Sequence, residues 1–96
     1  MLKLSSSRMN IGEVRIGQSK SFTVNLVNSS DLNIPITEIK PSCGSCTKAH
    51  VDGKSFVPAK SSVTMNLTFT PKSTGINIKS VTINKSLVFT FEAKVI

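Results

Sequence analysis

The residues best able to do chemistry are two cysteines and the single histidine, which lie close together in the sequence. Cys43 and Cys46 form a C-x-x-C pair, and His50 follows four residues later. Cysteine and histidine side chains are the usual tetrahedral ligands of zinc, and a structural zinc site usually has four of them. The only nearby candidate for the fourth ligand is Asp52. The spacing therefore makes Cys43, Cys46 and His50 candidate zinc ligands, although it lacks the second C-x-x-C pair of a strong zinc motif.

The same cysteine pair is open to two other interpretations. A dithiol redox centre needs the start of a helix beside its first thiol, and no helical pattern follows Cys46. Alternatively, both thiols are small packing groups at a corner between two sheets, able to close a short-loop disulfide when oxidised. We expect this structural role. We also expect the reduced form to be favoured, because the sequence opens without an export signal.

No other motif predicts catalysis or a cofactor. A catalytic triad needs a nucleophile, a histidine and a carboxylate that meet in space, and no pattern places the first and last of these near His50. The stretch Gly12 to Gly17 carries two glycines but opens no helix, so it does not predict a dinucleotide-binding loop. We therefore expect a protein that is not an enzyme and binds no cofactor.

The elements that position these residues are predicted to be strands. Apolar and polar side chains alternate from Val63 to Thr70, and the same period of two marks Ser21 to Val27 and Leu87 to Val95. Weaker strands are expected over Ile11 to Ile16, Leu32 to Lys40, Thr47 to Val51 and Ile76 to Ile83. The expected core side chains are Phe22, Leu26, Met65, Leu67, Phe69, Phe89 and Phe91.

Two irregularities in this pattern carry predictions of their own. Ile78 and Val81 are three residues apart, which shifts the phase and predicts a β-bulge near Lys79 and Ser80. Pro35 has no backbone donor for a ladder, so it should lie at an edge or where the chain crosses between sheets.

About seven short strands separated by turn signals predict an all-β fold, an immunoglobulin-like β-sandwich, with a small closed barrel as the alternative. A chain of 96 residues has room for one core. We expect residues 1–10 to form an N-terminal arm or first strand and residues 11–96 to form a single sandwich domain.

The charge of the chain favours acidic partners. Twelve Lys and Arg against five Asp and Glu give a net charge of +7. The cations are scattered singly and all five aromatic residues are Phe, so a nucleic-acid site is not expected. No window is apolar enough for a membrane span, and no signal peptide is evident. We therefore expect the protein in the cytoplasm unless an assembly carries it out, and neither secreted nor on a membrane.

The spacing of several residues resembles the DUF1573 family of small immunoglobulin-like domains, related to the ASH and major sperm protein group. The resemblance runs from about Ile11 to Ile96, and its most specific part is Ser42-Cys43-Gly44 followed by Cys46-Thr47. The other landmarks are Gly12-x-Val14-x-x-Gly17, Phe22-x-Val24-x-Leu26-x-Asn28, Ile36-x-x-Ile39-x-Pro41, Val57-Pro58 with Ser62, and Leu67-x-Phe69-x-Pro71 with Gly75. Family members usually space the cysteines by one residue, whereas Ser45 widens the gap here, and Ala59 replaces a common glycine.

The resemblance implies a non-enzymatic module that contacts other proteins. The most concrete expectation is a small bacteriophage virion protein, a capsid decoration or tail-surface component whose partners are capsid or tail subunits with acidic surfaces. The alternatives are a bacterial cytoplasmic adaptor and a small zinc or redox protein that uses the C-x-x-C pair. Contact is expected through sheet edges or loops, among them the strand around Ile34 and Ile36. The candidate partner-binding residues are Leu2, Lys3, Leu4, Arg8 and Arg15.

Overall fold

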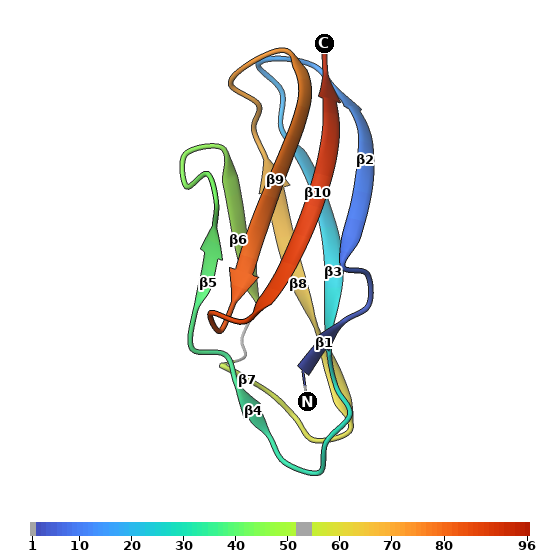
Figure 1. The fold of residues 1–96 in the computed structure, drawn as a ribbon, viewed down its shortest axis with the longest axis vertical. Coiled ribbons are helices and arrows are strands. Elements are labelled where there is room, and N and C mark those ends of the chain that lie inside the picture. The colour runs from blue at the N-terminus through green and yellow to red at the C-terminus, as the bar shows by residue number, and fades with distance from the viewer. Residues whose placement is uncertain (1, 52–54) are drawn as a thin grey trace.

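The chain forms two four-stranded β-sheets that lie face to face, with a two-stranded sheet at one end (Figure 1). The computed structural model describes residues 2–51 and 55–96. None of these residues lies in a helix that is long and apolar enough to cross a membrane. The strands of the described part are β1 (Leu2–Leu4), β2 (Arg8–Val14), β3 (Lys20–Asn28), β4 (Ile34–Pro35), β5 (Ile39–Pro41), β6 (Thr47–Val51), β7 (Phe56–Val57), β8 (Ser61–Phe69), β9 (Gly75–Ile83) and β10 (Leu87–Val95).

The order of the strands is that of an immunoglobulin-like sandwich, which confirms the predicted fold class. The first sheet has the order β1-β3-β8-β6 and the second the order β2-β10-β9-β5, while β4 pairs with β7. β2 runs parallel to β10, and the other pairs are antiparallel. The long last strand, β10, is central in its sheet.

The sequence locates several strands to within two residues, including β6, which it marks only weakly. β6 and β10 have the predicted bounds, and β3 and β8 differ from theirs by one or two residues. The stretch Leu32 to Lys40 instead holds two short strands, β4 and β5. Pro35 lies where the chain crosses from the first sheet to the second, as expected. β1 supplies a first strand within residues 1–10, and β7 escapes prediction because two residues show no period.

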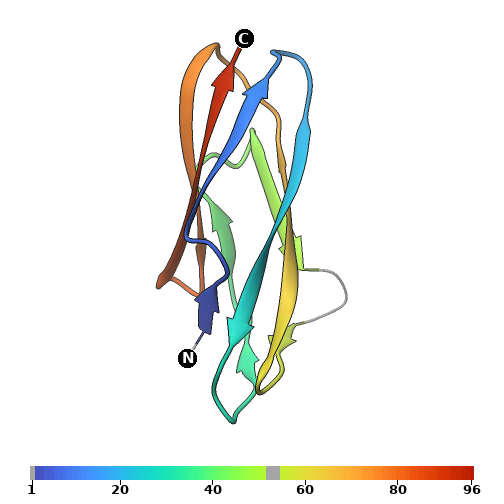
Figure 2. The same ribbon diagram turned by 90° about the vertical axis from the view of Figure 1, so that its right-hand side faces the viewer.

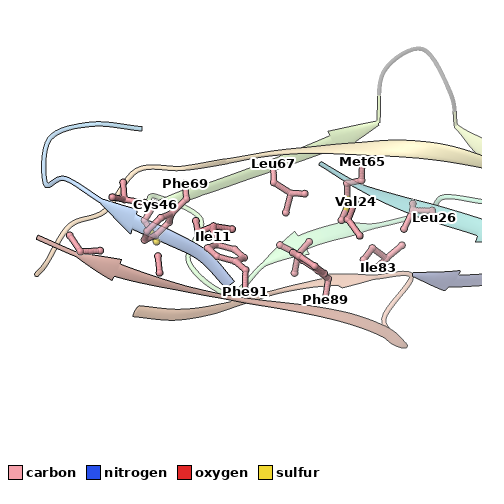
Figure 3. Packing of buried hydrophobic residues seen from close by; sticks show 14 of the residues in the cluster. Ile11, Val24, Leu26, Cys46, Met65, Leu67, Phe69, Ile83, Phe89 and Phe91 are labelled. Carbon is pink, nitrogen blue, oxygen red and sulfur yellow. The ribbon is translucent and has the colours of Figure 1, made fainter. Parts of the chain in front are cut away.

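The core fills the space between the two sheets (Figure 3). Of the predicted core residues, six are at most 1% exposed: Leu26, Met65, Leu67, Phe69, Phe89 and Phe91. Phe22 is half-buried and packs on Phe91, with ring centroids 5.0 Å apart. Phe91 also meets Phe69 edge to face at 5.3 Å. Because Phe91 belongs to the second sheet and the other two rings to the first, these contacts join the sheets.

The predicted β-bulge near Lys79 and Ser80 is wrong. β9 pairs with β10 in one continuous register along its whole length. Val81 faces the core, whereas Ile76 and Ile78 face solvent and are 62% and 55% exposed. The shift in the apolar pattern therefore marks the point where the apolar residues move from the outer face of the strand to its core-facing side. The backbone itself stays regular.

The chain switches sheets at both edges of the sandwich. At one edge, β1 belongs to the first sheet and β2 to the second, and residues 5–7 join them (Figure 2). At the other edge, β5 belongs to the second sheet and β6 to the first, and residues 42–46 join them. β5 pairs with β9 only from Val81 to Ile83.

Candidate functional site

The two cysteines lie at the corner between β5 and β6, and a disulfide closes that corner. Cys43 and Cys46 are bonded, with their Cα atoms 5.5 Å apart. Cys46 is 3% exposed and belongs to the core, and Cys43 packs against it half-buried. The amides of Cys46 and Thr47 donate to the Cys43 carbonyl at 3.3 and 3.0 Å, and this turn brings the side chains within bonding reach. The packing role at a corner between sheets is confirmed, and the expectation of reduced thiols is wrong.

The three candidate zinc ligands do not come together. Cys43 and Cys46 share a disulfide, so neither supplies the thiolate that zinc binds. His50 lies on β6 with its side chain on the outer face of the first sheet, opposite the core that holds Cys46. Within residues 2–51 and 55–96, no group of three or more His, Cys, Asp and Glu side chains could hold a metal ion. Asp52, the fourth candidate, lies outside the described residues.

His50 instead borders an open hollow on the outer face of the first sheet. The hollow has a volume of about 370 Å³, and its lining consists of Ser21, Phe22, Thr23, His50, Asn66, Leu67 and Thr68. In the strand register Asn66 lies between Thr23 and His50, so a hydroxyl, an amide and an imidazole form one row across β3, β8 and β6. No carboxylate of a described residue lines the hollow. A serine, histidine and carboxylate triad is therefore not assembled from the described residues at this place.

The residues predicted to bind a partner lie along β1 and β2. Leu2 and Leu4 pack against the core of their own chain, and β1 pairs with β3. Lys3 is exposed between them, Arg8 forms an ion pair with a β10 carboxylate at 3.4 Å, and Arg15 is exposed just after β2. β1 would have to leave β3 before the two leucines could dock elsewhere. Contact with a partner through these residues stays a prediction.

Two exposed residues that no sequence motif marks as a site are Ile76 and Ile78. Both lie on the outer face of β9, next to a part of that strand that β5 does not cover. The available signal was their spacing, since two isoleucines two residues apart share one face of a strand. Ile76 and Ile78 lie on the opposite face of the strand from Val81. A bulge was predicted only because all three apolar residues were assumed to face the core.

Known proteins agree with this architecture. A family model described as "Protein of unknown function (DUF1573)" matches residues 2–95. The match includes both sheets, the disulfide corner and the whole of β9. No curated protein matches the chain.

Several solved structures share the fold at low sequence identity. A protein of unknown function from Porphyromonas gingivalis W83 superposes with a TM-score of 0.77 at 12% identity, over 98% of this chain and 45% of that one. PapD-like domain 7 of human CEP192, described as an ASH / PapD-like domain, gives 0.68 at 10% identity over 99% and 84%. WR4, a member of the MSP family from C. elegans, gives 0.64 at 11% identity over 100% and 98%. The chain thus spans less than half of the P. gingivalis protein, and the likeness concerns the fold alone.

Proposed function

The chain belongs to the DUF1573 family, and we propose that it is a non-enzymatic module that acts by contact with an acidic protein partner. The observation that carries this proposal is the excess of twelve Lys and Arg over five Asp and Glu, a net charge of +7. Charged side chains stay at the surface of a small sandwich, so the excess surrounds the molecule with a positive field. Such a field attracts acidic surfaces and speeds their association.

The cations are spread over both sheets. Lys3 and Lys48 are exposed on strands of the first sheet, and Arg8, Lys40 and Lys94 are exposed on strands of the second. A charge distribution of this kind favours attachment to an extended surface. The spread of the cations over both sheets supports a binding module more than it supports a catalytic site.

The setting that we propose is the particle of a tailed bacteriophage, with acidic capsid or tail subunits as the partner. Two features support it. Small immunoglobulin-like domains are common on the heads and tails of such phages, and a positive surface suits attachment to an acidic shell.

The proposal is tested by finding the partner and measuring the role of charge. Cross-linking in the native source, followed by mass spectrometry, should recover an acidic protein. Binding of that protein should weaken several-fold between about 0.05 and 0.5 M salt, because exposed charges are then screened. A charge-reversed Lys3→Glu, Lys48→Glu variant should bind more weakly than a Lys3→Arg, Lys48→Arg control. Recovery of no protein partner, or binding that ignores both salt and charge reversal, would contradict the proposal, and recovery of a cellular protein would contradict only the phage setting.

A further inference from the structure

We propose that the first half of β9, Gly75–Lys79, is a docking site to which an extended acidic segment of the partner adds as a further strand of the second sheet. We name this stretch the open β9 segment. The inference rests on the proposed function, because it assigns a place to the partner contact proposed there.

The backbone of the open β9 segment has no neighbour on one side. The Ser42 amide donates to the Ser80 carbonyl at 2.8 Å, and the Ser80 amide donates to Ser42 Oγ at 3.0 Å. After Ser42 the chain turns away through the disulfide corner into β6. In the part of the chain that the structure describes, no strand pairs with β9 beyond Ser80 on this side, and β5 lies beside only the lower part of β9 (Figure 1).

The direction of the free backbone groups follows from the antiparallel ladder. Along a strand, the amide and carbonyl of one residue point to one side, and those of the next residue point to the other. Those of Ser80 point toward Ser42 and away from β10. Those of Ile78 and Ile76 point the same way, because they lie two and four residues earlier in a regular strand. The open β9 segment therefore presents the amides and carbonyls of both isoleucines to solvent, and this is the edge to which an extended peptide adds.

The side chains of the same two residues favour an apolar neighbour. Ile76 and Ile78 are 62% and 55% exposed on the outer face of the sheet. An added strand would place every second side chain beside them, as cross-strand pairs do within a sheet. Burial of this apolar surface would stabilise the complex. The partner segment should therefore carry apolar residues at alternate positions.

The charges around the open β9 segment favour an acidic occupant. Lys79 lies in the segment half-buried, and exposed Lys94 lies opposite Ile76 on β10. The carboxylate opposite Ile78 belongs to Glu92, and Arg8 already pairs with it at 3.4 Å. A second copy of the chain would bring a further charge of +7 to the same place. Because like charges repel, another protein with acidic residues fits this site better than a second copy does.

The uncovered part of the β3 edge is a matched control for the open β9 segment. β1 covers β3 only at Leu26–Asn28, and beyond that the Ser5 amide donates to the Asn25 carbonyl at 2.9 Å. By the same alternation, the amides of Thr23 and Ser21 point outward from an edge that no described strand covers. This edge differs from that of β9 in carrying a serine and a threonine on its outer face.

The test uses a capped synthetic peptide of sequence Glu-Val-Glu-Val-Glu-Val-Glu, with Lys in place of Glu as its counterpart. Amide hydrogen exchange is followed by NMR on the whole chain, with and without peptide. The acidic peptide should slow exchange at the amides of Ile76 and Ile78 and leave those of Ser21 and Thr23 unchanged. The basic peptide should not protect any of them.

Two proline variants test the backbone contact. Ile78→Pro removes an amide that points away from β10, so the β9–β10 ladder keeps its hydrogen bonds. It should weaken binding of the acidic peptide about tenfold, through a lost hydrogen bond and a lost apolar contact. Thr23→Pro makes the same backbone change on β3 and should leave the affinity within about twofold. If Ile78→Pro fails to fold, the double variant Ile76→Thr, Ile78→Thr keeps every amide and should lower the affinity by a similar factor.

Three outcomes would overturn the inference: no binding of the acidic peptide, protection at residues other than the open β9 segment, or protection of Ile76 and Ile78 that grows with protein concentration in the absence of peptide. The last would show that a second copy is the occupant. None of them removes the proposed function, which stands or falls separately on the cross-linked partner and its salt dependence.

Discussion

Two inner strands of this sandwich, β3 and β9, each leave half of one edge uncovered by any described strand, and these two open edges differ in the side chains that they carry. On β3, Lys20–Val24 places Ser21 and Thr23 on the outer face, whereas the open β9 segment places Ile76 and Ile78 there. Both strands are regular, and both direct the amides of these residues outward. An open edge invites another strand, and polar side chains are one of the ways in which proteins discourage that. The two edges therefore share one backbone geometry, but the polar side chains on β3 discourage an added strand, whereas the isoleucines on β9 favour one.

The two edges also differ in how the neighbouring chain is arranged. Beside β3, the Lys20 ammonium donates to the carbonyl of Ile11 on β2, which ties the edge to the other sheet. β2 bends there, with its register to β10 shifted between Glu92 and Lys94 and a φ of 82° at Gly12. Beside β9, the chain leaves through the disulfide corner and no such tie forms with a described residue. The Lys20 ammonium thus links the β3 edge to the other sheet, whereas a turn closed by a disulfide borders the β9 edge.

The largest expected effect comes from a change in the hydrophobic core that supports both edges. Phe91 of the second sheet is fully buried and touches the rings of Phe22 and Phe69 from the first sheet. Phe91→Ala should lower the free energy of unfolding by about 3 to 5 kcal/mol, because it leaves a cavity. Urea unfolding followed by circular dichroism measures this. Val88→Ala, on the exposed face of the same strand, should cost under about 1 kcal/mol. Equal effects of the two changes would mean that the core is not where the structure places it.

The second largest effect is expected from a variant that uncovers more of the β3 edge. Leu2→Ser with Leu4→Ser removes two half-buried leucines and should free β1 from β3. The expected loss is about 2 to 3 kcal/mol, less than for two fully buried leucines. If polar residues blunt the β3 edge, the acidic peptide should still protect Ile76 and Ile78 and leave the amides of Ser21 and Thr23 unprotected. Protection of Ser21 and Thr23 in this variant would contradict that interpretation.

The regular alternation of β3, β8 and β10 was predictable because one face of each strand is buried. The open β9 segment was not, since a bulge and a regular strand with outward isoleucines give the same letters. Long-range contacts were also beyond the sequence. Asn28 is 1% exposed, and its side-chain amide donates to the carbonyls of Leu32, Val57 and Pro58. No pattern near Asn28 in the sequence predicts that its side chain bonds to Val57 and Pro58, which lie about thirty residues away.

The third effect loosens the turn that borders the β9 edge. Cys43→Ser with Cys46→Ser should lower stability by about 2 kcal/mol, the loop-closure contribution of so short a loop. Affinity for the acidic peptide should not change, because β5 still pairs with β9. Thermal unfolding of the wild type with and without a reductant gives a second measure of the same contribution. A loss of peptide binding would mean that the corner itself makes the contact.

The smallest effect concerns the carboxylate beside the open β9 segment. Glu92→Gln removes an exposed ion pair with Arg8, so stability should fall by less than about 1 kcal/mol. Binding of the acidic peptide should rise about twofold at low salt, since a like charge has been removed. Asp31→Asn breaks the exposed pair with Lys60 and should leave binding unchanged. Titrations of both variants at two salt concentrations decide the matter, and an equal gain for both would assign the effect to net charge alone.

The side chains on the outer face decide which open edge accepts an added strand, if the proposed docking site on β9 is right. The direct measurement is hydrogen exchange on a variant that swaps them: Ser21→Ile and Thr23→Ile on β3, with Ile76→Thr and Ile78→Thr on β9. With the acidic peptide, protection should move from the amides of residues 76 and 78 to those of residues 21 and 23. Protection that stays on β9, or that does not depend on the swap, would contradict it.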